Sequence, residues 1–547
     1  MRRALAPVLV AVATLAAGLL PATAIGATTP AQDRDWCRQV TPSATWSVKN
    51  VEILCRIDAF RHAWDANGNL IADPNTPSGL RETLTQVIAL NWIEYGNPRP
   101  DQPAAAATRD VMFVSGRFGM KSYDMTNPLQ PKLLDWIGDG INDPNLGVDG
   151  NLAPNRFGLI DDVWQNEDMD VDHDRKLVFL SRDPRAYGGS TNDPTDRSGI
   201  YVFDVRNPEK LDIISFVELP GGHTTTCIND CKWLWTGGPA PNTDQQAMGW
   251  AGRPIFVTDM RDPSNPKASP QPIDLLRNDG TTDYAHDVDV DDQGIAWVSG
   301  RGAVRGYWTK GLHFDPLQGK ARVATAIDPV PYAGGGFEET VAPTRTTNSR
   351  FMHNAERHGD LIFATEEEFA GGSFPNGCAN DGPLMISSLE GSYNGEAWKS
   401  TTANKFRLKT VGTWHPYGKE GSSTSTDCSA HYFKTNGDIL SMSFYSQGSR
   451  FLDISDPSNP TEIAYFRPGT STWATYYHKG LYYSADRNGV YVLRLTADAG
   501  EAQAAGAAGL RSATAAAYEP VPADPAEEAL AALERPEGYQ CSIALPD

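Results

Sequence analysis

The stretch SRFLDISDPSNPTEIAYF, Ser449 to Phe466, decides the fold. A short apolar strand leads into the segment Asp453-Ile-Ser-Asp-Pro457, and a second apolar strand follows. Aspartate side chains cap turn amides, whereas proline presets φ and ends the hydrogen-bond ladder of a strand. The stretch therefore predicts the turn between the third strand and the outer strand of one β-sheet.

The same turn recurs at Asp124–Pro128, Asp204–Pro208 and Asp259–Pro263. Short apolar segments of one common type recur as well: VMFVSG (111–116), KLVFLS (176–181), KWLWTG (232–237), GIAWVSG (294–300), DLIFATE (360–366), DILSMSF (438–444) and GLYYSAD (480–486). Their spacing of roughly 40 to 80 residues is the length of a four-stranded blade with variable loops. We therefore predict an all-β fold, a β-propeller of seven four-stranded blades.

These residues resemble the LVIVD repeat, a blade-like repeat of exported bacterial and archaeal proteins. The resemblance covers about Arg109 to Leu495, and the Asp-x-x-Asx-Pro turns carry it. The blade near Gly306 to Asp328 departs from the pattern, since it lacks such a turn. The resemblance implies a β-propeller and an exported location, and it implies no settled reaction.

The expected organisation is a signal peptide (1–27), an N-terminal extension (28–108), the propeller (109–495) and a flexible tail rich in Ala, Pro and Glu (496–547). The last blade shows three strands and no outer one. The segment VKNVEILCRI (48–57) is the expected donor of the missing strand, because closing the ring removes an open sheet edge. Ser78 to Gly96 carries apolar residues at mixed spacing and is expected to form a helix outside the ring.

The location follows from a basic start at Arg2 and Arg3, an apolar run from Ala4 to Leu20, and small residues that offer a cleavage site. A membrane anchor is the alternative, but the run is short for a spanning helix. We expect a secreted, extracellular protein. The formal net charge of −21 repels phosphate and anionic lipid, so nucleic acid and membrane insertion are poor expectations.

Seven cysteines in an exported chain are expected to be paired for the most part. A small disulfide is expected between Cys227 and Cys231, and a CxxxC zinc site is the alternative. Further expected pairs are Cys378 with Cys428 and two of the cysteines Cys37, Cys55 and Cys541.

Four of the ten histidines share one repeat position, seven residues ahead of the turn before a second strand: His223, His286, His353 and His431. The second blade holds Asn166, Glu167 and Asp168 in the equivalent region, and the seventh holds Trp473. Heads of inner strands lie beside the channel of a propeller, so equivalent residues converge on one axis. Four imidazoles predict a site for one transition metal ion, Cu, Fe or Zn.

The structural alternative is that each histidine only bonds the backbone of a neighbouring blade, because repeats also propagate structural residues. Glu366, Glu367 and Glu368 are expected to hold a metal ligand in its orientation without binding the metal themselves. The acidic loop from Gly138 to Asp162 has carboxylates for Ca²⁺ but not the order of a calcium loop, and a solvated loop is the favoured interpretation.

Two function classes follow. The preferred one is an exported scaffold that binds an unknown small molecule, glycan or protein through its channel face and the long insertions at 138–165, 238–252 and 367–382. The alternative is a metal-dependent oxidoreductase with a four-histidine centre on the axis, because a cluster with an open position can activate water or dioxygen. No hydrolase elbow, metalloprotease helix or phosphate loop occurs in the sequence.

Overall fold

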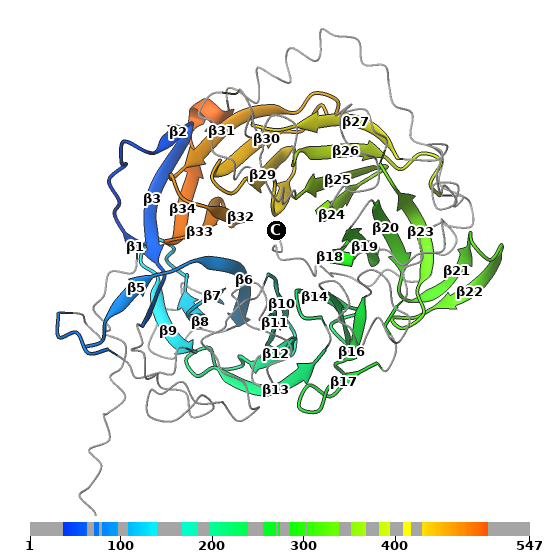
Figure 1. The fold of residues 1–547 in the computed structure, drawn as a ribbon, viewed down its shortest axis with the longest axis horizontal. Coiled ribbons are helices and arrows are strands. Elements are labelled where there is room, and N and C mark those ends of the chain that lie inside the picture. Colours follow the sequence, from blue (N-terminus) through cyan, green and yellow to red (C-terminus); the bar gives the residue numbers. More distant parts are fainter. Residues whose placement is uncertain are drawn as a thin grey trace, which may run out of the picture.

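Each of the seven apolar segments is the second strand of an antiparallel sheet, and the seven sheets surround one central axis (Figure 1). The chain is thus a seven-bladed β-propeller, as the repeat predicts. The computed structural model describes residues 37–62, 71–75, 79–96, 108–138, 167–183, 197–219, 221–238, 255–269, 272–273, 285–300, 303–337, 352–367, 382–393, 408–416, 419 and 429–500.

The first six blades have four strands that run from the axis outward in chain order, and the seventh does so for its first three strands. The first three blades consist of β6 (Val87–Gly96), β7 (Thr108–Gly116), β8 (Gly119–Asp124) and β9 (Lys132–Ile137); of β10 (Met169–Asp172), β11 (Leu177–Arg182), β12 (Gly199–Asp204) and β13 (Asp212–Glu218); and of β14 (Thr224–Ile228), β15 (Trp233–Gly237), β16 (Phe256–Asp259) and β17 (Lys267–Ala268).

The next two consist of β18 (Ala285–Val290), β19 (Ile295–Gly300), β20 (Ala303–Trp308) and β23 (Val330–Gly335), and of β24 (Met352–His358), β25 (Leu361–Glu366), β26 (Leu384–Ser388) and β27 (Lys409–Trp414). The sixth and seventh consist of β28 (Phe433–Asn436), β29 (Ile439–Ser443), β30 (Ser449–Asp453) and β31 (Thr461–Arg467), and of β32 (Thr472–His478), β33 (Leu481–Asp486) and β34 (Gly489–Leu495) with a donated strand.

The Asp-x-x-Asx-Pro segments are the turns between third and outer strands, as predicted. In each, the first aspartate accepts a hydrogen bond from the backbone amide two residues on: 3.0 Å at Asp124, 3.0 Å at Asp204, 3.1 Å at Asp259 and 2.9 Å at Asp453. The fourth blade instead carries a hairpin, β21 (Gly311–Asp315) and β22 (Lys320–Ala324), between its third and outer strands. This insertion accounts for the missing turn there.

The outer strand of the seventh blade comes from the other end of the chain. Strand β3 (Val51–Asp58) pairs antiparallel with β34, from Val51 opposite Leu495 to Asp58 opposite Gly489. Strand β1 (Cys37–Arg38) extends this sheet, and a disulfide joins Cys37 to Cys55. Strand β2 (Ser47–Lys49) pairs with β31 in the sixth blade. The N-terminal segment therefore ties the last two blades to the start of the chain.

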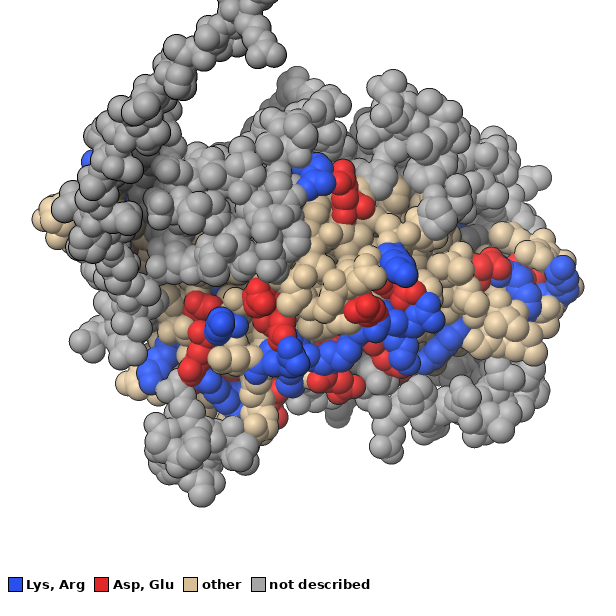
Figure 2. Space-filling model, turned by 90° about the horizontal axis from the view of Figure 1, so that it is seen from below, with Lys and Arg blue, Asp and Glu red and all other residues tan. Residues whose placement is uncertain are grey.

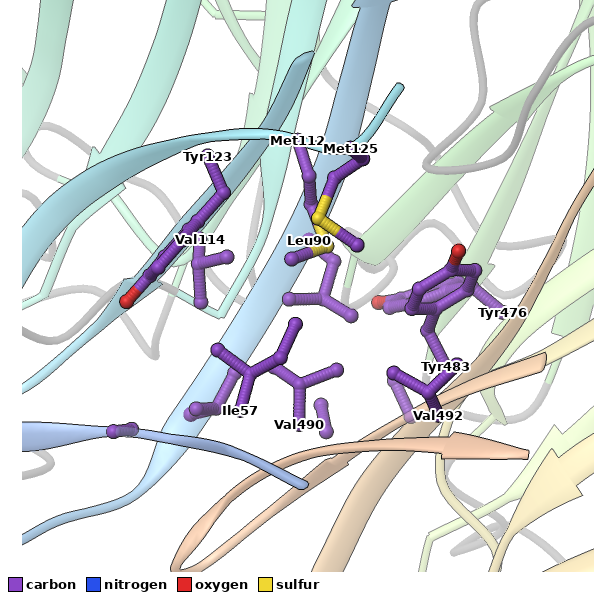
Figure 3. Packing of buried hydrophobic residues seen from close by; sticks show 14 of the residues in the cluster. Ile57, Leu90, Met112, Val114, Tyr123, Met125, Tyr476, Tyr483, Val490 and Val492 are labelled. Atoms are coloured by element: carbon purple, nitrogen blue, oxygen red, sulfur yellow. The ribbon is translucent and has the colours of Figure 1, made fainter. Parts of the chain in front are cut away.

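The core lies between neighbouring blades, where their facing sheets pack. Figure 3 shows this at the closure, where Leu90 and Met112 of the first blade meet Tyr483 and Val492 of the seventh, with Ile57 of β3 beside them. A second cluster joins the first blade to the second in the same manner. Because both faces of every blade are covered, the strands are apolar along most of their length.

The expected helix over Ser78 to Gly96 is wrong. The structure has β5 (Glu82–Leu84), which pairs with β4 (Phe60–His62), and then β6, the innermost strand of the first blade. The propeller thus starts before Arg109, the expected boundary. Residues Val87 to Ile93 are all buried, and a strand buried on both faces shows no alternation in its sequence. That is why the spacing resembled a helix.

The disulfide between Cys227 and Cys231 is present, so the alternative zinc site at these cysteines is wrong. Cys378, Cys428 and Cys541, the signal peptide, and the acidic loop beyond Gly138 lie outside the described residues. Among the residues that are described, no helix has the length and apolar character needed to cross a membrane.

The side of the ring carries charges of both signs. Figure 2 shows acidic and basic side chains interspersed on the described part of one side, without a broad area of a single sign. Exposed turns carry local ion pairs such as Arg206 with Asp204 and Arg261 with Asp259.

Candidate metal centre at the propeller axis

The heads of the inner strands bend toward the axis. The pairing of β18 with β19 shifts register between Ala285 and Asp287, so His286 is an extra residue in its strand. The same irregularity lies between Met352 and Ala355 in β24. A β-bulge turns a side chain that would otherwise follow the alternation of the strand. The two bulges let His286 and His353 face the channel together with the residues that follow them.

The four aligned histidines form one row at this end of the channel. The Nε2 atoms of His223 and His286 are 3.1 Å apart. The ring centroids of His286 and His353 are separated by 4.3 Å, and those of His353 and His431 by 3.8 Å. His286, His353 and His431 are at most 1% exposed. The shared repeat position thus brings all four imidazoles together from four successive blades.

Three of the rings are held from behind through Nδ1. His286 donates from Nδ1 to the carbonyl oxygen of His353 at 2.8 Å, and His431 donates from Nδ1 to that of Trp473 at 2.7 Å. Nδ1 of His223 lies 3.3 Å from a carboxylate oxygen of Asp183. A neutral imidazole that donates from Nδ1 presents Nε2 as a lone pair. The backbone bonds therefore orient His286 and His431 with Nε2 towards the axis.

Glu167 provides a carboxylate to the same point. Its Oε1 lies 3.2 Å from Nε2 of His353 and 2.9 Å from Nε2 of His431. Glu167 stands seven residues ahead of the turn residue Asp174, which is the interval that defines the four histidines. Asn166 to Asp168 is the region expected to be equivalent, and the same count of seven residues identifies Glu167 as its member at the ligand position.

A second carboxylate, Glu367, lies slightly farther out. Its oxygens are 3.9 Å from Nε2 of His353 and 3.8 Å from Nε2 of His431, and it accepts a hydrogen bond from the hydroxyl of Tyr445. Of the glutamates expected to support the site, Glu367 is the one placed here. Glu366 is buried at the end of β25, outside both groups of candidate ligand atoms, and Glu368 lies outside the described residues.

The charges of the site suit a cation. Burial and the neighbouring histidines place the pKa of His286 well below its usual value, and burial with His431 lowers the pKa of His353 to about 3. Burial opposes ionisation of Glu167, yet hydrogen bonds from His353 and His431 hold its pKa well below the usual range. Despite its burial, the neighbouring Glu167 and Glu367 raise the pKa of His431, so a metal ion would displace a proton from this ring. At neutral pH His286 and His353 are neutral imidazoles and Glu167 is an ionised carboxylate, the forms that bind metal ions.

Two sets of potential ligand atoms fall within 4.8 Å of one another. One consists of Glu167, His286 and His353, and the other of His353, Glu367 and His431. The two sets share His353, and His223 belongs to neither of them, with its Nε2 lying 3.1 Å from that of His286. Imidazole and carboxylate donors together suit Fe, Cu and Zn.

A cavity lies next to the histidine row on the channel side. Residues that immediately follow the heads line it: Asp168 after Glu167, Asp287 after His286, Asn354 after His353 and Tyr432 after His431. Its volume is about 380 Å³, which includes space open to solvent. The inner strands therefore present two chemically different layers to the channel, nitrogen donors at their heads and oxygen donors beyond.

Comparison with known proteins adds architecture alone. No protein-family model and no curated protein matches the sequence. Similar solved structures include the periplasmic gluconolactonase PpgL of Pseudomonas aeruginosa, with 10% identity, coverage of 80% of this chain and 98% of that chain, and a TM-score of 0.37. Sqt1 of Saccharomyces cerevisiae has 8% identity, coverage of 71% and 81%, and a TM-score of 0.38. A chain of the COPII outer coat vertex on membranes has 9% identity, coverage of 75% and 84%, and a TM-score of 0.38. None of these similarities bears on the function of this chain.

Proposed function

We propose that this protein is an exported metalloenzyme, an oxidoreductase that holds one Fe or Cu ion on the propeller axis. The ligands are His223, His286, His353, His431 and Glu167. The observation that carries the proposal is the convergence of the histidine row with Glu167 at 3.2 and 2.9 Å from two of the imidazoles. Bound there, the ion would supply redox chemistry with dioxygen or an organic reductant.

The number of donors favours a redox metal over zinc. Zinc prefers four ligands in a tetrahedron, and catalytic zinc sites keep three protein ligands and one open position. Four imidazoles and one carboxylate exceed that number, whereas iron and copper accept five or six ligands. Five protein ligands leave one position for dioxygen or substrate.

An exported location is part of the proposal. The apolar N-terminal run with two leading arginines supports it, and so do the disulfides Cys37–Cys55 and Cys227–Cys231, since disulfides form and persist in oxidising compartments. The resemblance to the LVIVD repeat points the same way. Fractionation of cells that express the full-length chain tests this part.

The deciding experiment is metal analysis of the mature protein purified without a histidine tag. We expect about one Fe or Cu per chain, since all the donors converge on one region. We expect its loss in the double variant His286→Ala/His353→Ala and a large decrease in Glu167→Gln. The matched control is His313→Ala, because His313 lies on the hairpin β21–β22, away from the axis.

Each result decides a separate part of the proposal. A folded wild-type protein without transition metal overturns the metal centre. Stoichiometric zinc overturns the oxidoreductase part and leaves a metal site. Iron or copper that does not increase dioxygen uptake with any of a panel of phenol, thiol and amine reductants also contradicts the oxidoreductase assignment.

The second candidate function is a binding scaffold without catalysis, for a small molecule, glycan or protein at the propeller face. The observation that favours it is the pair of Nδ1 bonds from His286 and His431 to the next blade, because these alone give the histidines a structural use. The long insertions at 138–165, 238–252 and 367–382 lie outside the described residues beyond Gly138, Gly238 and Glu367. In this case the histidine variants lose stability and no metal is bound.

A further inference from the structure

The channel contains a buried acidic cavity whose chemistry differs from that of the histidine row. Three inner strands contribute its carboxylates: Asp168 and Asp170 from the second blade, Asp287 and Asp289 from the fourth, and Glu356 from the fifth. Burying several carboxylates together costs free energy unless a cation or hydrogen bonds compensate them. The question is which of these charges the protein compensates by itself.

Part of the cavity is compensated. Lys434 lies 2.7 Å from Glu356 and 3.7 Å from Asp289, so one ammonium serves both carboxylates. Asp170 accepts hydrogen bonds at 2.7 Å from the amides of Val171 and Cys227. These contacts account for the carboxylates of Glu356, Asp289 and Asp170.

Asp168 accepts hydrogen bonds from the amides of Met169 at 2.7 Å and Thr225 at 3.3 Å, but three other polar atoms of the lining are not compensated. Oδ1 of Asp287 is buried and has no hydrogen-bond partner among the described residues, and the hydroxyls of Tyr432 and Tyr476 are in the same situation. All three residues line the cavity, and they are 4%, 2% and 2% exposed. A buried polar atom without a partner costs about 1–3 kcal/mol. Three such atoms around one space indicate that a ligand completes them.

The ligand must be small, cationic and able to satisfy oxygen atoms. The enclosed part of the cavity has room for an ion with a water ligand and not for an organic substrate. Carboxylate, amide and hydroxyl oxygens without an imidazole favour hard cations, and Ca²⁺ accepts six to eight such ligands in irregular arrangements. Asn354 and Thr226 add neutral oxygens to the same wall.

We propose that this cavity is a second cation site, which binds one Ca²⁺ ion through Asp287 and Asp168, with Tyr432 and Tyr476 hydrogen-bonded to its water ligands. The site lies beside the histidine centre in the channel and uses none of its ligands. It therefore does not depend on the proposed redox function. Its effect is to link the inner strands of the second and fourth blades to those of the sixth and seventh.

The test is equilibrium dialysis of the metal-loaded full-length mature protein against Ca²⁺ alone. We expect one Ca²⁺ per chain, and a loss of affinity of about tenfold or more in Asp287→Asn, since one anionic ligand is removed without a change of shape. Asp486→Asn is the matched control, because Asp486 is a buried carboxylate whose oxygens are bonded by Thr470 and Thr472. This control should bind Ca²⁺ as the wild-type protein does.

Two tyrosine variants test the cavity without changing Asp287. If Asp287→Asn does not fold, Tyr476→Phe and Tyr432→Phe remove single hydroxyls at the same cavity, and each should weaken Ca²⁺ binding. His223→Ala should lose the transition metal and keep Ca²⁺, since neither His223 nor Thr224 lines the cavity. A folded wild-type protein that binds no Ca²⁺, or binding unchanged in all three cavity variants, overturns the calcium site without touching the histidine centre.

Discussion

The two ring nitrogens of His286 serve different neighbours. Nδ1 bonds the backbone of the next blade, and Nε2 faces the axis at 3.1 Å from His223. The structural and the metal-binding interpretations of the repeated histidine are therefore compatible. A histidine that is propagated by duplication to hold neighbouring blades together already presents its second nitrogen to the channel.

A single carboxylate, Asp289, makes the stability of the folded protein depend on pH. Burial raises its pKa to about 7 from an ordinary value of 3.8, despite Lys434 beside it. Because the pKa is higher in the folded protein, the stabilising contribution is complete below about pH 4 and is lost as the pH rises through 7. Without metal or calcium, we expect Asp289→Asn to be more stable than wild type at pH 8 by about 4 kcal/mol and equal to it at pH 4.

Urea unfolding of the metal-free and calcium-free protein across this pH range checks the expectation. Asp262→Asn is the control, since Asp262 lies in an exposed outer turn and bonds the amide of Ser264. A variant that gains no stability at high pH would show that Asp289 is ionised at no cost in the folded protein.

At the scale of the strand, the site depends on how closely neighbouring blades approach. Gly237 ends β15, and a Cβ atom there would lie 2.3 Å from the carbonyl oxygen of His286 and 2.7 Å from Oγ1 of Thr224. Only glycine allows β18 to come this near. The head of the fourth blade is thus positioned by a residue of the third blade that has no side chain.

We therefore expect Gly237→Ala to decrease metal occupancy although Gly237 binds nothing. The added methyl group must move β18 or β15, which costs about 1–3 kcal/mol and displaces His286. Gly96→Ala is the matched control, because Gly96 also ends a strand and has no atom within 4 Å of its added Cβ. Equal metal content and equal urea midpoints in the two variants would contradict this account of the blade contact.

At the scale of the whole molecule, closure of the ring determines whether the heads converge. The seventh blade obtains its outer strand from Val51–Asp58, and the disulfide Cys37–Cys55 cross-links that strand to β1. An unclosed ring would expose the edge of β34 and allow the first and last blades to separate. The metal centre uses heads from the second to the sixth blade, so it needs the ring to hold its curvature.

We expect the double variant Cys37→Ser/Cys55→Ser to lower the free energy of unfolding by about 3 kcal/mol, as the loss of a disulfide that closes a loop of this length does. The comparison is Cys227→Ser/Cys231→Ser, whose cysteines are only 4 residues apart against 18. The shorter loop should cost less. Equal losses in urea unfolding would argue that β3 holds the ring without its disulfide.

The repeating strands and turns could be predicted from the amino-acid sequence. The seven second strands, the Asp-Pro turns and the common position of His223, His286, His353 and His431 are periodic features, and periodicity along the chain is visible without coordinates. The missing outer strand of the last blade was visible for the same reason, since a blade with three strands leaves an edge open.

The remaining features depend on contacts between blades. Val87–Gly96 is a strand because neighbouring blades cover both its faces, and burial on both faces removes the alternation that identifies a strand. Glu167 joins the histidines because it stands at the same place in another blade, and the unsatisfied oxygens of Asp287, Tyr432 and Tyr476 share one cavity because the ring brings three blades together. Local patterns specify each blade, whereas proximity across the axis exists only once seven blades have closed around it.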